Sequence, residues 1–197
     1  MTLMVEKPHT IGAVSTFEEL CRALEAINEA VPTGFSAEII GGNIVMSPWS
    51  RGYYLDIMES LSEQLKPHAP EGHRVSQAPC LFVFPGQSRA YGPDLHVADA
   101  DATRVRGIRL PGEALSLVTE LTSESTADFD RDDKVKVYGV AGVPVYVLVD
   151  MLQGDVTVYH DPTPDRGYRM HTQVKFGETV HIPAPFDFEL DTAGWEA

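Results

Sequence analysis

The sequence predicts an α/β (α+β) fold in which a mixed β-sheet is flanked by helices and followed by antiparallel C-terminal strands. Apolar residues recur at helical spacing in three segments, and short runs of β type lie between these segments. The last third of the chain alternates apolar and polar residues between turns. The 197 residues contain no internal repeat and no obvious linker. We therefore expect a single domain over residues 1–197, with residues 1–14 as a loose lead-in.

Three helices are expected. The first lies within residues 15–31 and opens with a capping box, in which Glu18 follows Ser15 at the required spacing. The second lies within residues 53–66, where apolar residues keep the helical period. The third lies within residues 130–143 and is expected to end near Gly142.

The strands are read from short apolar runs and alternation. Two strands of a hairpin are expected over residues 35–48, around the turn formed by Gly41, Gly42 and Asn43. In the segment 114–122, Leu115, Leu117 and Leu121 should share one face, while Ser116, Val118 and Glu120 share the other. The remaining expected strands are 73–86, interrupted at Pro79, then 93–99, 145–150, 155–160, 168–174 and 179–183. Segment 145–150 is apolar enough to be buried on both faces.

Composition restricts the function. The formal net charge of −14 disfavours general attraction to nucleic acid, whose phosphates attract basic proteins. Binding would need a bound cation or a local basic patch, for which Arg104, Arg106 and Arg109 are the candidates; a solvated loop is the alternative reading. No segment is apolar enough to span a membrane and no secretory signal is present, so we expect a cytoplasmic protein without membrane contact. Cys21 and Cys80 are typical of reduced, buried thiols.

Three acidic residues stand inside otherwise apolar strands: Glu38 in "SAEII", Asp94 in "PDLHV" and Glu120 in "TEL". Burying one carboxylate without a partner costs several kcal/mol. Each acid therefore lies at an exposed edge, in a buried ion pair or in a metal site. Three such acids on three strands favour convergence at one site. Two carboxylates, with water and a substrate phosphate, are a typical environment for Mg²⁺.

The run "EIIGGNIVMSP…GPDLHV…VTELTS…DRDDKVKVYGVAGVPVYVLVD" resembles the Uma-type putative restriction endonuclease family of the PD-(D/E)XK nuclease superfamily. The order and spacing of these motifs carry the resemblance over roughly residues 17–192. It implies a restriction-endonuclease-like fold and a metal-dependent endonuclease that hydrolyses phosphodiester bonds in DNA, with Mg²⁺ or Mn²⁺ as cofactor. Double-strand cleavage normally needs two active sites, so a homodimer is expected.

The resemblance also implies roles for individual residues. Asp94 and Glu120 match the metal ligands, and Glu38 matches a supporting acid of the active site. The superfamily's lysine usually lies two residues after the second acid, where this chain has Thr122. In the Uma-type pattern it lies on the following helix, where Lys134 or Lys136 could serve. These two side chains point about 200° apart on a helix, and the motif spacing favours Lys134.

Other readings accompany this one. Many relatives have a histidine where this chain has Tyr53 or Tyr54, which favours an alternative function as an inactive nuclease-fold module that binds nucleic acid or a protein partner. Asp130, Asp132 and Asp133 are interpreted as acids that complement the dipole at a helix start. His96 shares a strand face with Asp94 and either lines the site or is a structural histidine.

Overall fold

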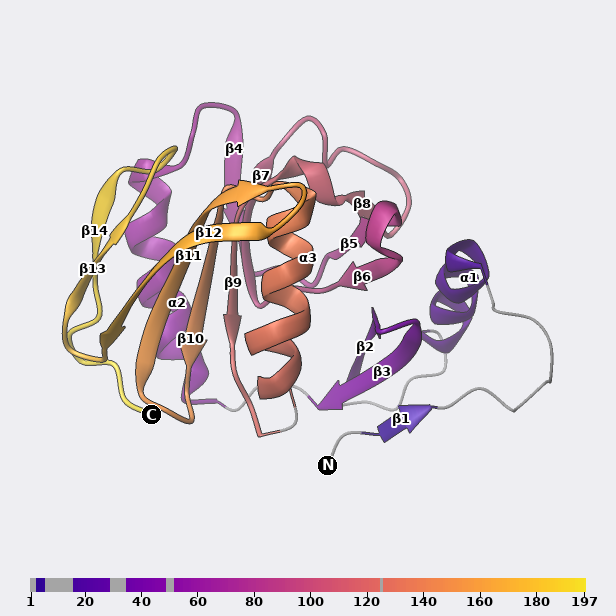
Figure 1. Ribbon diagram of the computed structural model, residues 1–197, viewed down its shortest axis with the longest axis horizontal. Coiled ribbons are helices and arrows are strands. Elements are labelled where there is room, and N and C mark those ends of the chain that lie inside the picture. Colours follow the sequence, from indigo (N-terminus) through magenta and orange to yellow (C-terminus); the bar gives the residue numbers. More distant parts are fainter. Residues whose placement is uncertain (1–2, 6–15, 29–34, 49–51, 125) are drawn as a thin grey trace.

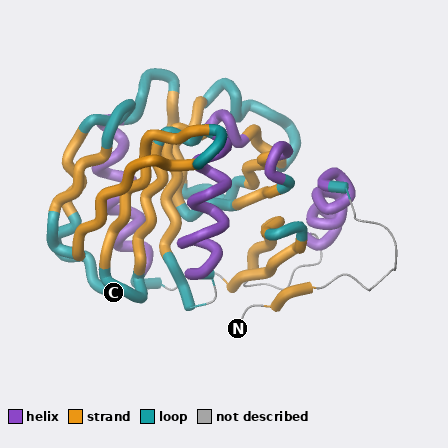
Figure 2. The backbone as a smooth tube through the Cα atoms, in the orientation of Figure 1, coloured by secondary structure: helices purple, strands orange, loops and turns teal. Residues whose placement is uncertain are grey.

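The computed structural model describes residues 3–5, 16–28, 35–48, 52–124 and 126–197. Its described part contains two six-stranded mixed sheets, a separate pair of antiparallel strands and three α-helices. Figures 1 and 2 show the larger body of the molecule around one sheet, with α1 and strands β1–β3 projecting at one side. The predicted fold class, a mixed sheet flanked by helices with antiparallel strands at the C-terminal end, is confirmed.

The first sheet has the strand order β1-β3-β2-β6-β5-β8. Its hairpin of β2 and β3 turns at Gly41 and Gly42, which both have positive φ values, as a tight hairpin turn requires. β2 joins β6 through a single residue pair, Ile39 with Ala90. The strands are β1 (Leu3–Val5), β2 (Phe35–Ile40), β3 (Asn43–Pro48), β5 (Leu81–Phe84), β6 (Arg89–Tyr91) and β8 (Arg109–Pro111).

The second sheet, here called the central sheet, has the order β12-β11-β10-β9-β7-β4. β9 and β10 are parallel, whereas all other neighbours in this sheet are antiparallel. Every residue of β9 and of β10 is buried, which confirms that segment 145–150 is covered on both faces. The strands are β4 (His73–Ser76), β7 (Leu95–Asp99), β9 (Leu115–Leu121), β10 (Val145–Asp150), β11 (Asp155–Thr163) and β12 (Gly167–Lys175).

Helices cover both faces of the central sheet. α2 (Tyr54–Leu65) packs its apolar residues against one face, in a cluster that includes Leu117 and Val147. α3 (Lys134–Ala141) covers the other face, where Tyr138 packs among side chains that include Val118. Figure 1 shows α3 in front of the sheet and α2 behind it. The strands β13 (Thr179–Ile182) and β14 (Phe188–Asp191) add residues to the α2 side.

α1 (Phe17–Asn28) packs on the first sheet, where Leu20 and Leu24 meet Ile39. Its capping box is formed by Thr16 and Glu19, one residue later than predicted. The Glu19 N–H donates to Thr16 Oγ1 at 3.3 Å, and the Thr16 N–H donates to Glu19 Oε2 at 2.7 Å. Both pairs have the spacing of a capping box, so sequence alone does not distinguish them. Ser15, the predicted cap, lies outside the described residues.

The segment before α3 is a π-helical turn, Phe129–Asp133, which runs directly into the helix. The Lys134 N–H donates to the Phe129 carbonyl across this turn. Tyr146 of β10 donates its hydroxyl to the Asp130 carbonyl at 3.0 Å and so fixes the turn to the central sheet. π-turns within helices occur frequently at functional sites. The helix ends at Gly142 in a left-handed conformation, as predicted.

Several local predictions were wrong. Segment 73–86 forms two strands in different sheets, β4 and β5, rather than one interrupted strand. Leu115 packs with the α3-side cluster, because a bulge opposite Val97 and Ala98 shifts the register and changes the face of β9 on which Leu115 lies. In the lead-in, residues 3–5 form β1, whereas residues 6–14 lie outside the described part. Strands β6, β8 and β14 were also not foreseen.

In the parts of the chain that the structure describes, no helix combines the length and apolar character that crossing a membrane requires.

Candidate active site

Asp94 and Glu120 lie opposite each other on neighbouring strands. β7 and β9 pair Leu95 with Thr119 and His96 with Val118, so the next position in this register places Asp94 opposite Glu120. Residues directly opposite in an antiparallel pair project from the same face. Here that face is the one covered by α3. The Leu121 N–H donates to Asp94 Oδ2 at 2.8 Å, which holds Asp94 against the end of β9.

Lys134 reaches into the same place from the first turn of α3. Its ammonium nitrogen lies 3.0 Å from Glu120 Oε1 and 3.6 Å from Glu38 Oε1. Lys134 and Glu120 are each only 3% exposed. Lys136, the rival in the sequence, is exposed on the helix surface. The two lysines therefore point to different environments, as their helical spacing requires.

Glu38 comes from the first sheet. It lies on β2, next to the single residue pair that joins β2 to β6, and it is 7% exposed. The Gly92 N–H donates to Glu38 Oε1 at 2.8 Å, immediately before the Pro93–Asp94 step. The structure thus brings together Glu38, Asp94, Glu120 and Lys134, although they belong to two sheets and a helix.

Asp130 is a fourth carboxylate in this group: it stands in the first turn of the helical segment, as predicted, and it also forms a buried ion pair that was not predicted. It is 1% exposed, and its Oδ1 lies 3.1 Å from the Lys134 ammonium. The available signal was the four-residue spacing of Asp130 and Lys134, which puts both side chains on one helical face. Of the other two acids, Asp132 is exposed, and Asp133 binds Arg89 through two hydrogen bonds of 3.0 Å.

The surroundings of the site oppose ionisation of two of these acids, Asp94 and Glu120. Burial raises the pKa of Asp94 to about 6, and the neighbouring Asp130 and Glu38 add to this rise, while the Leu121 N–H and Lys134 oppose it. Burial also raises the pKa of Glu120 well above its ordinary value, despite the adjacent ammonium. For Lys134, burial alone would lower the pKa, but Asp130, Glu120 and Glu38 outweigh burial and raise it. Lys134 is therefore the charged partner of the cluster.

This donor set fits a divalent cation. Four carboxylates surround one ammonium, so the charge of Lys134 does not balance theirs. Burial raises the pKa of two of these acids, Asp94 and Glu120, above the ordinary value. Mg²⁺ needs only one or two protein carboxylates, with water and substrate oxygens as the other ligands. Within the described ranges, no group of three or more acidic, histidine or cysteine side chains is arranged to hold a metal ion as it stands. Asp94 and Glu120, which lie opposite each other, are the two carboxylates that could hold such an ion.

A second group of side chains fixes the strand ends behind the site. Arg131 binds Asp150 at the end of β10, with its Nε 2.7 Å from Oδ2. Thr122 donates its hydroxyl to Asp150 Oδ1 at 3.2 Å. Tyr54 donates its hydroxyl to the Thr122 carbonyl at 2.8 Å. These contacts connect the π-turn, the end of β9 and the start of α2. Tyr54, one of the two tyrosines at the place where the resemblance implies a histidine, therefore connects the start of α2 to the end of β9.

His96 and the arginine patch are not part of the site. His96 is buried against Phe82, its Nδ1 has no partner among the described residues, and burial lowers its pKa to about 4. It is therefore a neutral histidine within the core. Arg109 is paired with Glu18 and Glu25, and Arg104 with Asp101. This segment follows β7, whereas Asp94 precedes it, and the ion-pair partners of Arg104 and Arg109 are not members of the carboxylate cluster.

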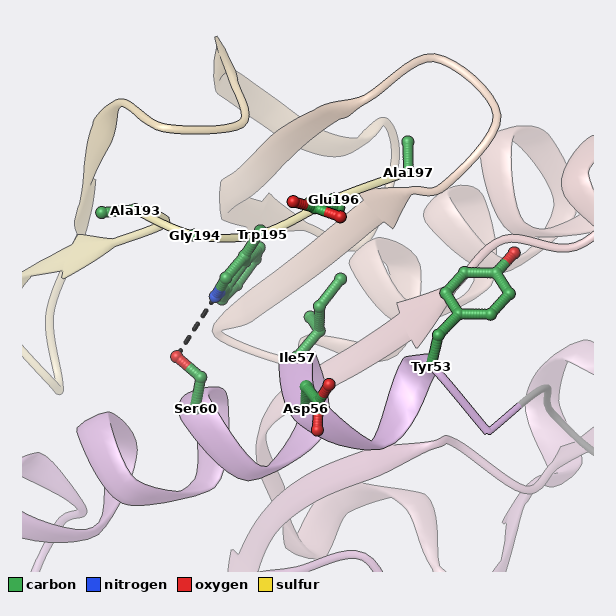
Figure 3. A pocket seen from close by; sticks show the side chains of 9 residues that line it. All are labelled: Tyr53, Asp56, Ile57, Ser60, Ala193, Gly194, Trp195, Glu196 and Ala197. Atoms are coloured by element: carbon green, nitrogen blue, oxygen red, sulfur yellow. Dashed lines mark hydrogen bonds between the residues drawn. The ribbon is translucent and has the colours of Figure 1, made fainter.

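A cavity of about 760 Å³ lies elsewhere, between α2 and the segment 193–197. Figure 3 shows Trp195 above α2 and Tyr53 at the side of the cavity. The indole N–H of Trp195 donates to the Ser60 hydroxyl at 3.2 Å. None of the residues predicted for the site lines this cavity. It is therefore distinct from the carboxylate cluster.

Known proteins resemble the chain in sequence and in structure. A family model named Uma2, described as a putative restriction endonuclease, matches residues 14–193. A crystal structure described as a putative nuclease belonging to DUF820, from Anabaena variabilis ATCC 29413, superimposes with a TM-score of 0.61 and 16% sequence identity. The alignment covers 86% of this chain and 90% of that chain. The comparison with curated proteins found no match.

Proposed function

Because the chain belongs to the Uma2 family of putative restriction endonucleases, we propose that it is a metal-dependent endonuclease that hydrolyses phosphodiester bonds in DNA. The observation that carries this proposal is the convergence of Glu38, Asp94 and Glu120 around Lys134 beneath α3. Three acids and a lysine on four separate segments would be costly to bury together without a role, since each needs compensation.

The proposed roles follow from position. Asp94 and Glu120 would hold Mg²⁺ or Mn²⁺, which can supply an activated water and neutralise charge on the scissile phosphate. Lys134 would bind a non-bridging phosphate oxygen and stabilise the charge that develops there. Glu38, held by the Gly92 N–H, would keep the ammonium directed toward the cluster. Tyr138 donates its hydroxyl to Glu120 Oε1 at 2.9 Å and would orient that ligand.

Because the protein is strongly acidic, the metal ion would contribute to substrate binding as well as to cleavage. With a net charge of −14, the chain repels a polyanion at long range, so local cations must supply the attraction. The bound cation and Lys134 together would provide it. We therefore expect that removing the metal weakens DNA binding in addition to stopping cleavage.

Plasmid nicking tests the proposal. The purified protein, incubated with supercoiled plasmid and Mg²⁺ or Mn²⁺, should convert it to nicked or linear DNA, and EDTA should stop the reaction. Asp94→Ala should lose this activity by roughly 100-fold or more, because a ligand of the activating cation is removed. Equal cleavage by Asp94→Ala and wild type would contradict the assignment. DNA binding without cleavage by either protein would favour the inactive module.

Metal binding should depend on pH through Asp94. A group with a pKa of about 6 is protonated in much of the population at pH 5, and a divalent cation must displace that proton to bind. The stabilisation by excess Mg²⁺, measured as the rise in melting temperature, should therefore be clearly larger at pH 7.5 than at pH 5. Asp94→Asn, which carries no titrating group at this position, should lose most of this stabilisation at both pH values. A rise in wild type that is equal at both pH values would contradict this role.

A further inference from the structure

We propose that Asp130 is a positioning residue that retains the Lys134 ammonium in the site when the metal ion engages Glu120. This inference rests on the proposed function and adds a residue to it. Asp130 would not touch the metal or the substrate, and it would act through Lys134 alone. Its contacts differ from those of the other three acids.

The partners of each carboxylate differ. Glu120 Oε1 accepts from the Tyr138 hydroxyl and faces Lys134, and Glu38 Oε1 accepts from the Gly92 N–H. Asp130 has no comparable donor. Among the described residues, its Oδ1 accepts no hydrogen bond, and the Lys134 ammonium at 3.1 Å is its ion-pair partner. Burying a carboxylate to 99% costs free energy, and the ion pair with Lys134 is the contact that compensates for this cost.

Metal binding would change the balance around Lys134. In the structure, the ammonium has Glu120 at 3.0 Å and Asp130 at 3.1 Å, with Glu38 further away at 3.6 Å. A divalent cation on Glu120 would withdraw that partner and repel the ammonium, because like charges at short range oppose each other. Asp130 would then be the anion nearest to the ammonium, and it lies on the same helical segment as Lys134.

The local structure makes this arrangement rigid. Asp130 and Lys134 lie four residues apart on the segment that contains the π-turn, so both side chains point to the sheet. Tyr146 fixes the Asp130 carbonyl, and Asp133 binds Arg89 and the Tyr91 hydroxyl of β6. The turn is thus attached to both sheets, and a movement of Lys134 toward solvent would need several buried contacts to break.

A double-mutant cycle tests the inference. Wild type, Asp130→Asn, Lys134→Met and the double variant are compared by thermal unfolding, once in EDTA and once in excess Mg²⁺. Asparagine keeps the shape of the side chain and removes its charge. The coupling between the two positions, read from the non-additive shift in melting temperature, should be larger in Mg²⁺ than in EDTA. Asp132→Asn, an exposed change on the same turn, is the matched control and should show no coupling to Lys134.

Plasmid nicking gives the second readout. Asp130→Asn should lower kcat by about 10- to 100-fold, with KM for plasmid unchanged, and should have no further effect in the Lys134→Met background. Coupling that is equal or smaller in Mg²⁺, or additive losses of kcat, would overturn the inference. A wild-type protein that Mg²⁺ does not stabilise would overturn the proposed function, and the inference with it. The two failures are therefore distinguishable.

Discussion

Replacing Asp94 by asparagine should make the metal-free protein more stable at pH 7.5 while it removes nuclease activity. Burial raises the pKa of Asp94 from its ordinary value of 3.8 to about 6. Between these values the folded protein keeps a proton that the unfolded chain releases. The contribution of Asp94 to stability therefore falls as pH rises through this window, and its full cost is present above about pH 6.

The size of the gain follows from the shift. One pKa unit corresponds to about 1.4 kcal/mol, so Asp94→Asn should raise the free energy of unfolding by about 1 to 3 kcal/mol at pH 7.5. The gain should shrink as pH falls toward 4, because the carboxyl group is then protonated in the folded protein and close to half protonated in the unfolded chain. Urea unfolding in EDTA at pH 7.5, 5 and 4 measures this dependence.

Asp99, at the other end of β7, is the matched control. The N–H groups of Ala102 and Asp101 donate to its carboxylate and hold the pKa of Asp99 below its ordinary value. Asp99→Asn should therefore lower stability at neutral pH and leave nicking unchanged. A loss of stability in Asp94→Asn at pH 7.5 would contradict a destabilising carboxylate at that position. Stability changes of opposite sign in Asp94→Asn and Asp99→Asn would distinguish an acid that serves function from an acid that stabilises the fold.

The second large effect is expected from Lys134→Met. Removing one partner of a buried ion pair typically costs about 3 to 5 kcal/mol, because the remaining charge is left without compensation. Here Glu120 and Asp130 would both lose their cation. The loss should be smaller at pH 5, because burial raises the pKa of Glu120 and this acid can then take up a proton. Chemical denaturation at pH 7.5 and pH 5 measures the difference, and the nicking rate should fall strongly as well.

Lys136→Met provides the comparison on the same helix. Lys136 is exposed, and a change there should alter stability by less than about 0.5 kcal/mol and leave nicking within a few-fold of wild type. Similar losses in the two variants would mean that the cluster does not depend on the Lys134 charge. The pair also decides between the two lysines that the sequence left as rivals.

Much of the fold could be predicted because periodicity reports burial. The hairpin at Gly41 and Gly42, the helix over Tyr54–Leu65 and the buried strand Val145–Asp150 all follow from local pattern. Pairing between distant segments leaves no such pattern. Segment 73–86 divides between two sheets, because Pro79 separates strands that find different neighbours. The three-residue strands β6 and β8 are too short to show alternation.

Most residues of the candidate site could be predicted from the sequence, whereas their relative positions could not. An acid inside an apolar strand is conspicuous, and Glu38, Asp94 and Glu120 were found in this way. Asp130 was missed because an acid near a helix start has an ordinary explanation, and only the π-turn and the burial of its side chain separate it from Asp132. The ion pair of Asp133 with Arg89 depends on tertiary contact and has no sequence signal.

The single pair of Ile39 with Ala90 has a consequence for how the molecule can vary. Glu38 stands beside this junction, whereas Asp94 and Glu120 belong to the continuous pairing of β7 and β9. An insertion or exchange in the hairpin of β2 and β3 would therefore alter one acid and leave the two proposed metal ligands in register. Reactivity could be adjusted from the hairpin while β7 and β9 keep their pairing, so the activity of the site and the stability of the central sheet can be changed independently.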